Sequence, residues 1–236
     1  MPFTLARQPR DLVFRPARLA DRTTLAPHYV RVRLEGDALR GFGSLGSDDH
    51  IRVFFPDPAA AARDGGAPLD ADALRAFPSR EYTPLAWDAD AGVLELEFVV
   101  HGDAGVAGRW AADAPLGSTV GVGGPRGSMV LDGEPAGWFL AGDETALPAI
   151  RRFLAQFAQG ADSAPRGLVL VEVPDASHEP PLEAPAGTEL RWVHRGSAPA
   201  GEALAAALDA LGPADRPAPR HPPPTSSRSS PPRPPS

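Results

Sequence analysis

Positions 80–128 read REYTPLAWDADAGVLELEFVVHGDAGVAGRWAADAPLGSTVGVGGPRGS, and this stretch holds most of the information about the fold. Three apolar segments with high β propensity recur in it, and turn-forming residues separate them. We expect strands at Glu81–Ala86, Val93–His101 and Thr119–Val122. Because several short strands joined by turns are typical of an antiparallel barrel, this stretch predicts a β-barrel domain.

The residues that precede this stretch continue the β pattern. Apolar and charged residues alternate over 30–35, which is the period of a half-buried strand. A second strand is expected at His50–Phe55, where a proline follows and ends it. The segment 56–79 is rich in Ala, Asp, Gly and Pro, which predicts a surface insertion with a short helix near Ala71–Phe77. Residues 1–134 are therefore predicted to form one β-barrel domain.

After position 135 the pattern changes to strands and helices that follow one another. Apolar residues at positions 147, 150, 154 and 157 give a predicted helix one apolar face. A continuous apolar run at Leu168–Val173 is typical of a parallel strand that is covered on both faces. The order strand, helix, strand, strand, helix predicts an α/β domain over residues 135–211. The five expected segments are Trp138–Ala141, Ala146–Ala158, Leu168–Val173, Glu189–Val193 and Glu202–Leu211.

The composition narrows the possible chemistry. The 236 residues include no cysteine, which excludes disulfides, thiolate metal sites and iron–sulfur clusters, so redox chemistry would need a bound organic cofactor. The net charge of −7 argues against nucleic-acid binding. All 23 basic residues are arginine, which indicates a GC-rich gene, so each arginine needs its own argument before it is assigned to a ligand. The N-terminal region has no long apolar run, and we expect a monomeric, cytoplasmic protein without a membrane span.

The predicted strand that begins at Arg80 has side chains suited to a flat, phosphorylated ligand. Alternation places Arg80 and Tyr82 on one face of the strand, and Glu81 and Thr83 on the other. An arginine pairs with a phosphate, a tyrosine ring stacks on a heterocycle, and a threonine hydroxyl can bond to the edge of that heterocycle. The alternative interpretation is an ordinary strand with a polar and an aromatic residue.

Two loops are further candidates for ligand binding. HGDAGVAGRW at 101–110 is a glycine-rich turn before a helix, where free backbone N–H groups and the helix dipole favour a pyrophosphate. AGDETALP at 141–148 follows a strand at its carboxyl end, where ligands bind in α/β sheets. The alternatives are a turn without a ligand and plain helix capping by Asp143 or Thr145. Neither loop is the G-x-G-x-x-G fingerprint of dinucleotide-binding proteins.

In this order the segments resemble the siderophore-interacting protein family of FAD-dependent ferric-siderophore reductases, a branch of the ferredoxin–NADP reductase superfamily. The family pattern combines R-x-Y-T, H-G-x-x-G-x-A-x-x-W, G-P-R-G-S and G-D-E-T-A-L-P-A, and Gly142–Ala149 is the most specific match. The resemblance covers about Phe14–Leu211. It implies an antiparallel FAD-binding β-barrel followed by an NAD(P)H-binding α/β domain. Electrons would pass from NADPH or NADH to FAD and then to Fe(III) in a bound siderophore, which holds Fe(II) far more weakly.

The resemblance also implies roles for individual residues, although no catalytic side chain, because the flavin transfers the electrons. The FAD phosphate and the isoalloxazine would contact Arg80, Tyr82 and Thr83. The pyrophosphate and adenosine side would be held by His101 and Gly105–Gly108, and the nicotinamide side of the cleft would be lined by Asp143, Glu144 and Thr145. The expected cofactor-binding residues are Arg80, Tyr82, Thr83, His101, Gly102, Gly105, Val106, Ala107, Gly108, Asp143, Glu144, Thr145 and Ala146. An anionic ferric siderophore needs a local basic patch on a negatively charged protein. Arg52 and Arg126 are the candidates, and the alternative for both is a surface arginine.

Two features depart from the family pattern. Pro84 and Leu85 follow Thr83, where the family often has a hydrophobic residue and then an arginine, so one ligand contact is missing. Residues 212–236 include ten prolines and none of Leu, Ile, Val or Phe, which predicts a disordered tail. We therefore expect an α/β domain that is truncated at its C-terminus by a frameshift or a mis-assigned end. A non-catalytic FAD- or siderophore-binding protein and a ferredoxin-fed electron-transfer flavoprotein are the alternatives to the reductase.

Overall fold

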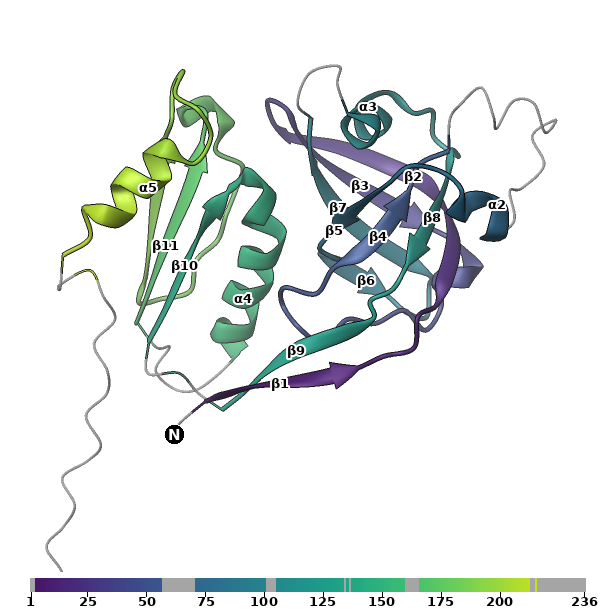
Figure 1. Ribbon diagram of the computed structural model, residues 1–236, viewed down its shortest axis with the longest axis horizontal. Coiled ribbons are helices and arrows are strands. Elements are labelled where there is room, and N and C mark those ends of the chain that lie inside the picture. The colour runs from purple at the N-terminus through teal and green to yellow at the C-terminus, as the bar shows by residue number, and fades with distance from the viewer. Residues whose placement is uncertain are drawn as a thin grey trace, which may run out of the picture.

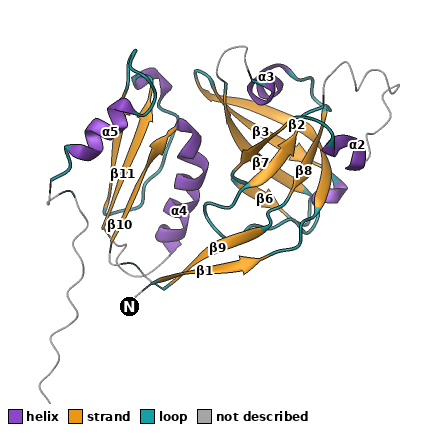
Figure 2. Ribbon diagram, in the orientation of Figure 1, coloured by secondary structure: helices purple, strands orange, loops and turns teal. Residues whose placement is uncertain are grey.

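The computed structural model describes residues 3–56, 71–100, 105–133, 135, 137–159, 166–212 and 215. Figure 1 shows a sheet-rich domain on the right and a smaller domain on the left in which helices flank a sheet. Figure 2 shows that strands dominate the first domain, whereas the second alternates strands with helices. The predicted fold class, an antiparallel barrel followed by an α/β domain, is confirmed.

The barrel is a single antiparallel sheet of seven strands. These are β2 (Phe14–Ala26), β3 (Tyr29–Glu35), β4 (Ile51–Phe54), β5 (Ser79–Tyr82), β6 (Ala86–Asp88), β7 (Val93–Val99) and β8 (Thr119–Gly123). They are hydrogen-bonded in the order β5-β4-β8-β2-β3-β7-β6. The described part also holds η1 (Asp37–Leu39), α2 (Ala71–Arg75) and α3 (Val106–Asp113). The short helix expected near residues 71–77 is therefore confirmed.

The barrel core follows from the alternation of apolar residues along its strands. Val32 and Leu34 of β3 are fully buried, and so are Leu94 and Leu96 of the paired strand β7. Full burial of such a side chain stabilises the fold by roughly 1.5–3 kcal/mol. α3 covers one end of this core, because Trp110 on its inner face is buried against the same cluster.

The α/β domain is built on three parallel strands, β10 (Gly137–Asp143), β11 (Arg166–Val173) and β12 (Thr188–His194), in that order across the sheet. η2 (Glu144–Ala146) and α4 (Leu147–Gln159) follow β10, η3 (Ala176–His178) follows β11, and α5 (Glu202–Asp209) follows β12. Figure 1 shows α4 and α5 on opposite sides of the sheet. The predicted apolar face of α4 is confirmed, because Leu147, Ile150, Leu154 and Phe157 are all buried.

The structure differs from the sequence analysis in three respects. A single strand over 81–86 is wrong: β5 ends at Tyr82 and β6 begins at Ala86, because Pro84 lies between them and has no N–H for the ladder. The strand expected to reach His101 ends at Val99 in the described part. The pairing of β1 (Thr4–Pro9) with β9 (Gly127–Asp132) was not expected. Every residue of β1 is exposed, so this strand has no buried apolar face that a pattern could detect.

Helix α4 lies between the parallel sheet and the barrel and fixes the two domains against each other (Figure 1). Arg152 donates to the Oγ atom of Ser44 at 2.8 Å and to its carbonyl oxygen at 3.1 Å. The guanidinium of Arg152 also lies 5.1 Å from the ring centroid of Trp87. The preceding Arg151 reaches Glu97 of β7 at 3.2 Å. Two adjacent arginines therefore hold one helix to two separate parts of the barrel.

The predicted tail begins at residue 212, and the structure describes only Gly212 and Asp215 of it. Asp215 accepts a hydrogen bond from the backbone N–H of Gly212 at 2.8 Å and pairs with Arg191 of β12 at 2.5 Å. The remaining residues of the predicted tail lie outside the described part of the chain.

Candidate functional site

A cleft of about 510 Å³ lies where the barrel meets the carboxyl end of β10. The barrel lines it with the end of β5, the N-terminal turn of α3 and parts of β3 and β7. The α/β domain lines it with η2 and the first turn of α4. The predicted site residues that meet here are Arg80, Tyr82, Thr83, Gly105, Ala107, Gly108, Glu144 and Thr145. Three segments far apart in the sequence thus converge on one space.

The barrel wall offers a cation and an aromatic ring. Among the described residues, the Arg80 guanidinium donates only to the carbonyl oxygen of Ser79, at 2.9 Å, and has no carboxylate partner. Tyr82 packs on Phe98 with 4.2 Å between the ring centroids, which holds its ring at the wall. Burial raises the pKa of Tyr82 to about 12, although nearby Arg80 acts in the opposite direction. This wall can therefore bind an anion beside a flat ring.

The N-terminus of α3 presents free backbone donors to the cleft. Gly105 is the N-cap residue of this eight-residue helix, and no side chain of the described residues caps it. Gly105, Ala107 and Gly108 line the cleft. Because uncapped first-turn N–H groups and the helix dipole favour negative charge, this end of α3 suits a phosphate group.

Two of the predicted residues at α3 have a different status. Val106 packs against the barrel core instead of lining the cleft. His101 and Gly102 lie outside the described residues.

The loop after β10 is held in place by two contacts. The Asp143 carboxylate caps η2, because it accepts from the backbone N–H of Thr145 at 2.9 Å and from its hydroxyl at 2.5 Å. Glu144 is buried and forms a bidentate pair with Arg195 at 2.6 and 2.8 Å. Ala146 packs in the core of the α/β domain. Of the four cofactor-binding residues expected in this loop, Glu144 and Thr145 line the cleft, whereas Asp143 and Ala146 shape the turn.

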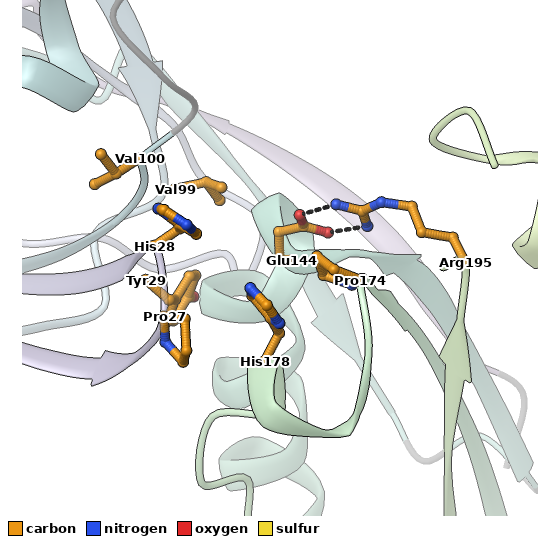
Figure 3. Close-up of a pocket in the computed structure, with 9 residues that line it drawn as sticks. All are labelled: Pro27, His28, Tyr29, Val99, Val100, Glu144, Pro174, His178 and Arg195. Atoms are coloured by element: carbon orange, nitrogen blue, oxygen red, sulfur yellow. Dashed lines mark hydrogen bonds and ion pairs between the residues drawn. The ribbon is translucent and has the colours of Figure 1, made fainter. Parts of the chain in front are cut away.

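A second, smaller hollow of about 310 Å³ adjoins the cleft and shares Tyr29, Val99 and Glu144 with it. Figure 3 shows its lining, with the two dashed bonds between Glu144 and Arg195. His28 of the barrel and His178 of η3 stack across it, with 5.9 Å between ring centroids. Sequence reasoning did not find this hollow, because its residues come from strand ends and turns of both domains, which only domain packing brings together.

Sequence reasoning also missed a buried carboxylate network, whose residues Tyr29 and Glu97 line the cleft. Glu97 accepts a hydrogen bond from the Tyr29 hydroxyl at 2.6 Å, from Arg31 at 2.7 and 3.2 Å, and from Arg151 at 3.2 Å. Burial, followed by the neighbouring Glu97 carboxylate, raises the pKa of Tyr29 far above its ordinary value. Arg31 lies directly opposite Glu97 in the strand register. A prediction of strand pairing could therefore have indicated the Arg31–Glu97 ion pair, but no other part of the network.

The two arginines expected to bind substrate are exposed and do not line the cleft. Arg52 pairs with Glu81 on the neighbouring strand at 2.7 Å. Arg126 lies in the loop between β8 and β9. Within the described residues, no group of three or more potential metal-ligating side chains is present, and no helix has the length and apolar character needed to cross a membrane.

Comparisons with known proteins agree with this architecture. Residues 18–129 match the family model described as the siderophore-interacting FAD-binding domain, and residues 135–220 match that of the siderophore-interacting protein. The chain is 34% identical over 195 residues to the NADPH-dependent ferric-chelate reductase of Escherichia coli K12, covering 78% of this chain and 72% of that protein. It is 33% identical over 196 residues to the ferric vibriobactin reductase ViuB of Vibrio cholerae, covering 79% and 69%.

A solved structure gives the same result. The crystal structure of a siderophore utilization protein from T. fusca superposes with a TM-score of 0.72 at 34% identity, covering 89% of this chain and 80% of that one. The family expected from the sequence motifs is thus confirmed by family models, relatives and structure. The chain belongs to the siderophore-interacting protein family.

Proposed function

We propose that this protein is an FAD-dependent oxidoreductase that takes electrons from NADPH or NADH and reduces Fe(III) in a siderophore in the cytoplasm. The observation that carries the proposal is the cleft, where Arg80, the Tyr82 ring and the N-terminal end of α3 face the loop after β10. Among the described residues, Arg80 has no carboxylate partner and α3 has no side-chain cap. The names of two relatives, a ferric-chelate reductase and a ferric vibriobactin reductase, support the substrate class. The ferredoxin partner and the monomeric state stay predictions.

The residues of the barrel wall fit FAD, which would supply the redox chemistry when it is bound. Arg80 would hold a phosphate oxygen, because its guanidinium has no competing carboxylate in the described part of the chain. The first-turn N–H groups of α3 would bind the pyrophosphate, and Gly105 leaves room there, because a Cβ on it would meet no atom of the described residues within 4 Å. Tyr82 would pack against a flat ring, and Thr83 would bond to its edge.

The loop at 143–146 would shape the nicotinamide side of the cleft. The Glu144–Arg195 pair and the Asp143 cap hold this loop, so a dinucleotide would meet a preformed wall. Arg52 and Arg126 would attract an anionic ferric siderophore, because the protein as a whole is negative and only a local positive field can concentrate such a substrate.

Replacing Arg80 with methionine tests the cofactor site. The loss of a charge-assisted hydrogen bond of about 1.5–3 kcal/mol should weaken FAD binding roughly 10- to 150-fold. Isothermal titration of the apoprotein with FAD measures this. The matched control is Arg18→Met, because Arg18 is exposed on β2 and does not line the cleft. Equal FAD affinity in the two variants would contradict the assigned role of Arg80.

Anaerobic spectrophotometry tests the activity. NADPH or NADH should bleach the flavin absorbance, and a ferric siderophore should then restore it while an Fe(II) chelator develops colour. A protein that binds FAD and siderophore but is never reduced by either nucleotide would instead be a binding protein. Reduction by ferredoxin alone would identify an electron-transfer flavoprotein.

A further inference from the structure

Releasing iron from a strong siderophore needs protons as well as electrons. Catecholate oxygens resemble the phenolate of tyrosine, whose conjugate acid has a pKa near 10, so near neutral pH they retain the metal or take up a proton. Carboxylate oxygens, whose acids have a pKa near 4, leave iron without being protonated. A reductase for the first kind of ligand therefore gains from a proton donor beside the iron. This step rests on the proposed reductase function.

Most titratable groups that line the cleft cannot supply this proton. Burial keeps Tyr82 protonated, with a pKa of about 12, and that of Tyr29 is raised further. The Tyr29 hydroxyl also donates to Glu97. Arg80 does not lose its proton in a protein. These groups are therefore weak acids at neutral pH.

The carboxylates of the cleft are engaged as hydrogen-bond acceptors. Glu144 accepts two bonds from Arg195, and the buried Glu97 accepts from two arginines and a tyrosine. Glu81 pairs with Arg52. The oxygens of all three carboxylates thus already accept from arginine N–H groups, and none of the three is free to approach a ligand oxygen.

The remaining titratable group among the described lining residues is His50. Its imidazole makes no hydrogen bond or ion pair within the described part of the chain, and the residue is exposed. Histidine is the side chain whose ordinary titration falls between pH 5 and 8. His50 is therefore both accessible and free to exchange a proton with a ligand.

The position of His50 places it at the expected flavin-ring end of the cleft. β4 and β5 pair with Ile51 opposite Tyr82, and continuing this antiparallel register puts His50 opposite Thr83. His50 shares the outer face of β4 with Arg52, two residues later. A Cβ on Gly124 would lie 3.8 Å from the His50 carbonyl oxygen, so the loop that bears Arg126 adjoins it.

The charged groups around His50 are mixed in sign. Arg52 pairs with Glu81 on the same face as His50, Arg80 and Arg126 are cationic, and Asp49 accepts bonds from buried hydroxyls.

We propose that His50 is the proton donor that protonates a siderophore oxygen as the iron is reduced. Fe(III) of the bound siderophore would take up one electron, which FAD would supply in the proposed reductase, and become Fe(II). The imidazolium N–H of His50 transfers its proton to a ligand oxygen. The Fe–O bond breaks with its electron pair left on that oxygen, and solvent then reprotonates the imidazole. His50 is then a catalytic residue for ligands with strongly basic oxygens, and it has no part in flavin reduction.

The test compares His50→Gln with His194→Gln, a change at an exposed histidine of β12 outside the cleft. Two substrates are used at about pH 7.5: a ferric tris-catecholate, and Fe(III)–EDTA, whose donor oxygens are carboxylates. The His50 variant should release Fe(II) from the catecholate about 100-fold more slowly than wild type, at the low end of what a positioned general acid contributes. Its reduction of Fe(III)–EDTA and the bleaching of its flavin by NADPH should stay within about twofold of wild type.

A second readout needs no turnover. The imidazole NMR signal that disappears in the His50→Gln protein is assigned to His50. The redox-inert Ga(III) tris-catecholate should shift this signal in the wild-type protein and leave the His194 signal in place. Equal slowing of both iron substrates, or no slowing of either, would overturn the proposal. A wild-type protein that takes no electrons from NADPH, NADH or ferredoxin would overturn the reductase function itself, and the assignment of His50 with it.

Discussion

Replacing Glu97 with alanine would leave the Arg151 guanidinium in the domain interface without a carboxylate partner among the described residues. The Glu97 side chain is fully buried, and that of Arg151 is 15% exposed. Breaking a buried pair by removing one partner typically costs about 3–5 kcal/mol. The Tyr29 hydroxyl would lose its acceptor as well. The bond from Arg31 adds little, because Arg31 is one-third exposed and solvent screens it.

We therefore expect the Glu97→Ala protein to lose about 3–5 kcal/mol of unfolding free energy. For a chain of this size this corresponds to a decrease in Tm of roughly 6–20 °C. Urea denaturation followed by tryptophan fluorescence measures the free energy, and calorimetry measures the Tm. Flavin reduction by NADPH should slow too, because Arg151 belongs to the helix that holds the α/β domain against the barrel.

The matched control is Glu95→Ala, two residues earlier on the same face of β7. Glu95 is half-buried, and its opposite partner Arg33 pairs with Glu35 instead. Its replacement should cost less than about 1 kcal/mol. If the Glu97 and Glu95 variants lost the same stability, the network would not be the interaction that fixes the domains, and this reasoning would be refuted.

Two further results are expected. Burial raises the pKa of Tyr82 to about 12 and that of Tyr29 higher still, so the folded apoprotein should show little tyrosinate absorbance at 295 nm near pH 10. Because the pKa of both tyrosines is raised in the folded state, the stability that their protonated form contributes is complete below about pH 10 and is lost as the pH rises through 12. A folded protein whose tyrosines titrate like free tyrosine would contradict this prediction. Glu144→Gln weakens the bidentate pair with Arg195 and should cost about 1–3 kcal/mol by urea denaturation, whereas the exposed control Glu202→Gln should cost under about 1 kcal/mol.

The strands and helices that the sequence predicted well are those with one buried face. The alternation in β3 and the 147/150/154/157 face of α4 both record a partition between core and solvent, which a pattern can detect. The exposed strand β1 and the break at Pro84 depend on pairing partners and on backbone hydrogen bonds. Neither leaves a periodic signal, so both were missed.

The same distinction applies to the candidate site. Residues within short motifs, such as Arg80 and Tyr82, could be found from their order along the chain. Tyr29, Glu97 and His50 could not, because they enter the cleft through strand register and domain packing. The residue type of Glu97 is also misleading, because a glutamate in a strand usually indicates a solvent-exposed face. Here hydrogen bonds from three donor side chains make its burial possible.

The ribbon of β1 and β9 has a mechanical consequence for the molecule. β9 is the segment that leaves the barrel toward β10, and six residue pairs register it against β1 (Figure 1). Because β9 is hydrogen-bonded to β1 along its whole length, the pair resists extension. A pulling force on β1 would load the β1–β9 hydrogen bonds in shear. A force applied to β1, for example through a surface tether or a bulky fusion, would be transmitted through β9 and would change the distance between the two domains. An immobilised protein should therefore be attached elsewhere if the cleft is to keep its width.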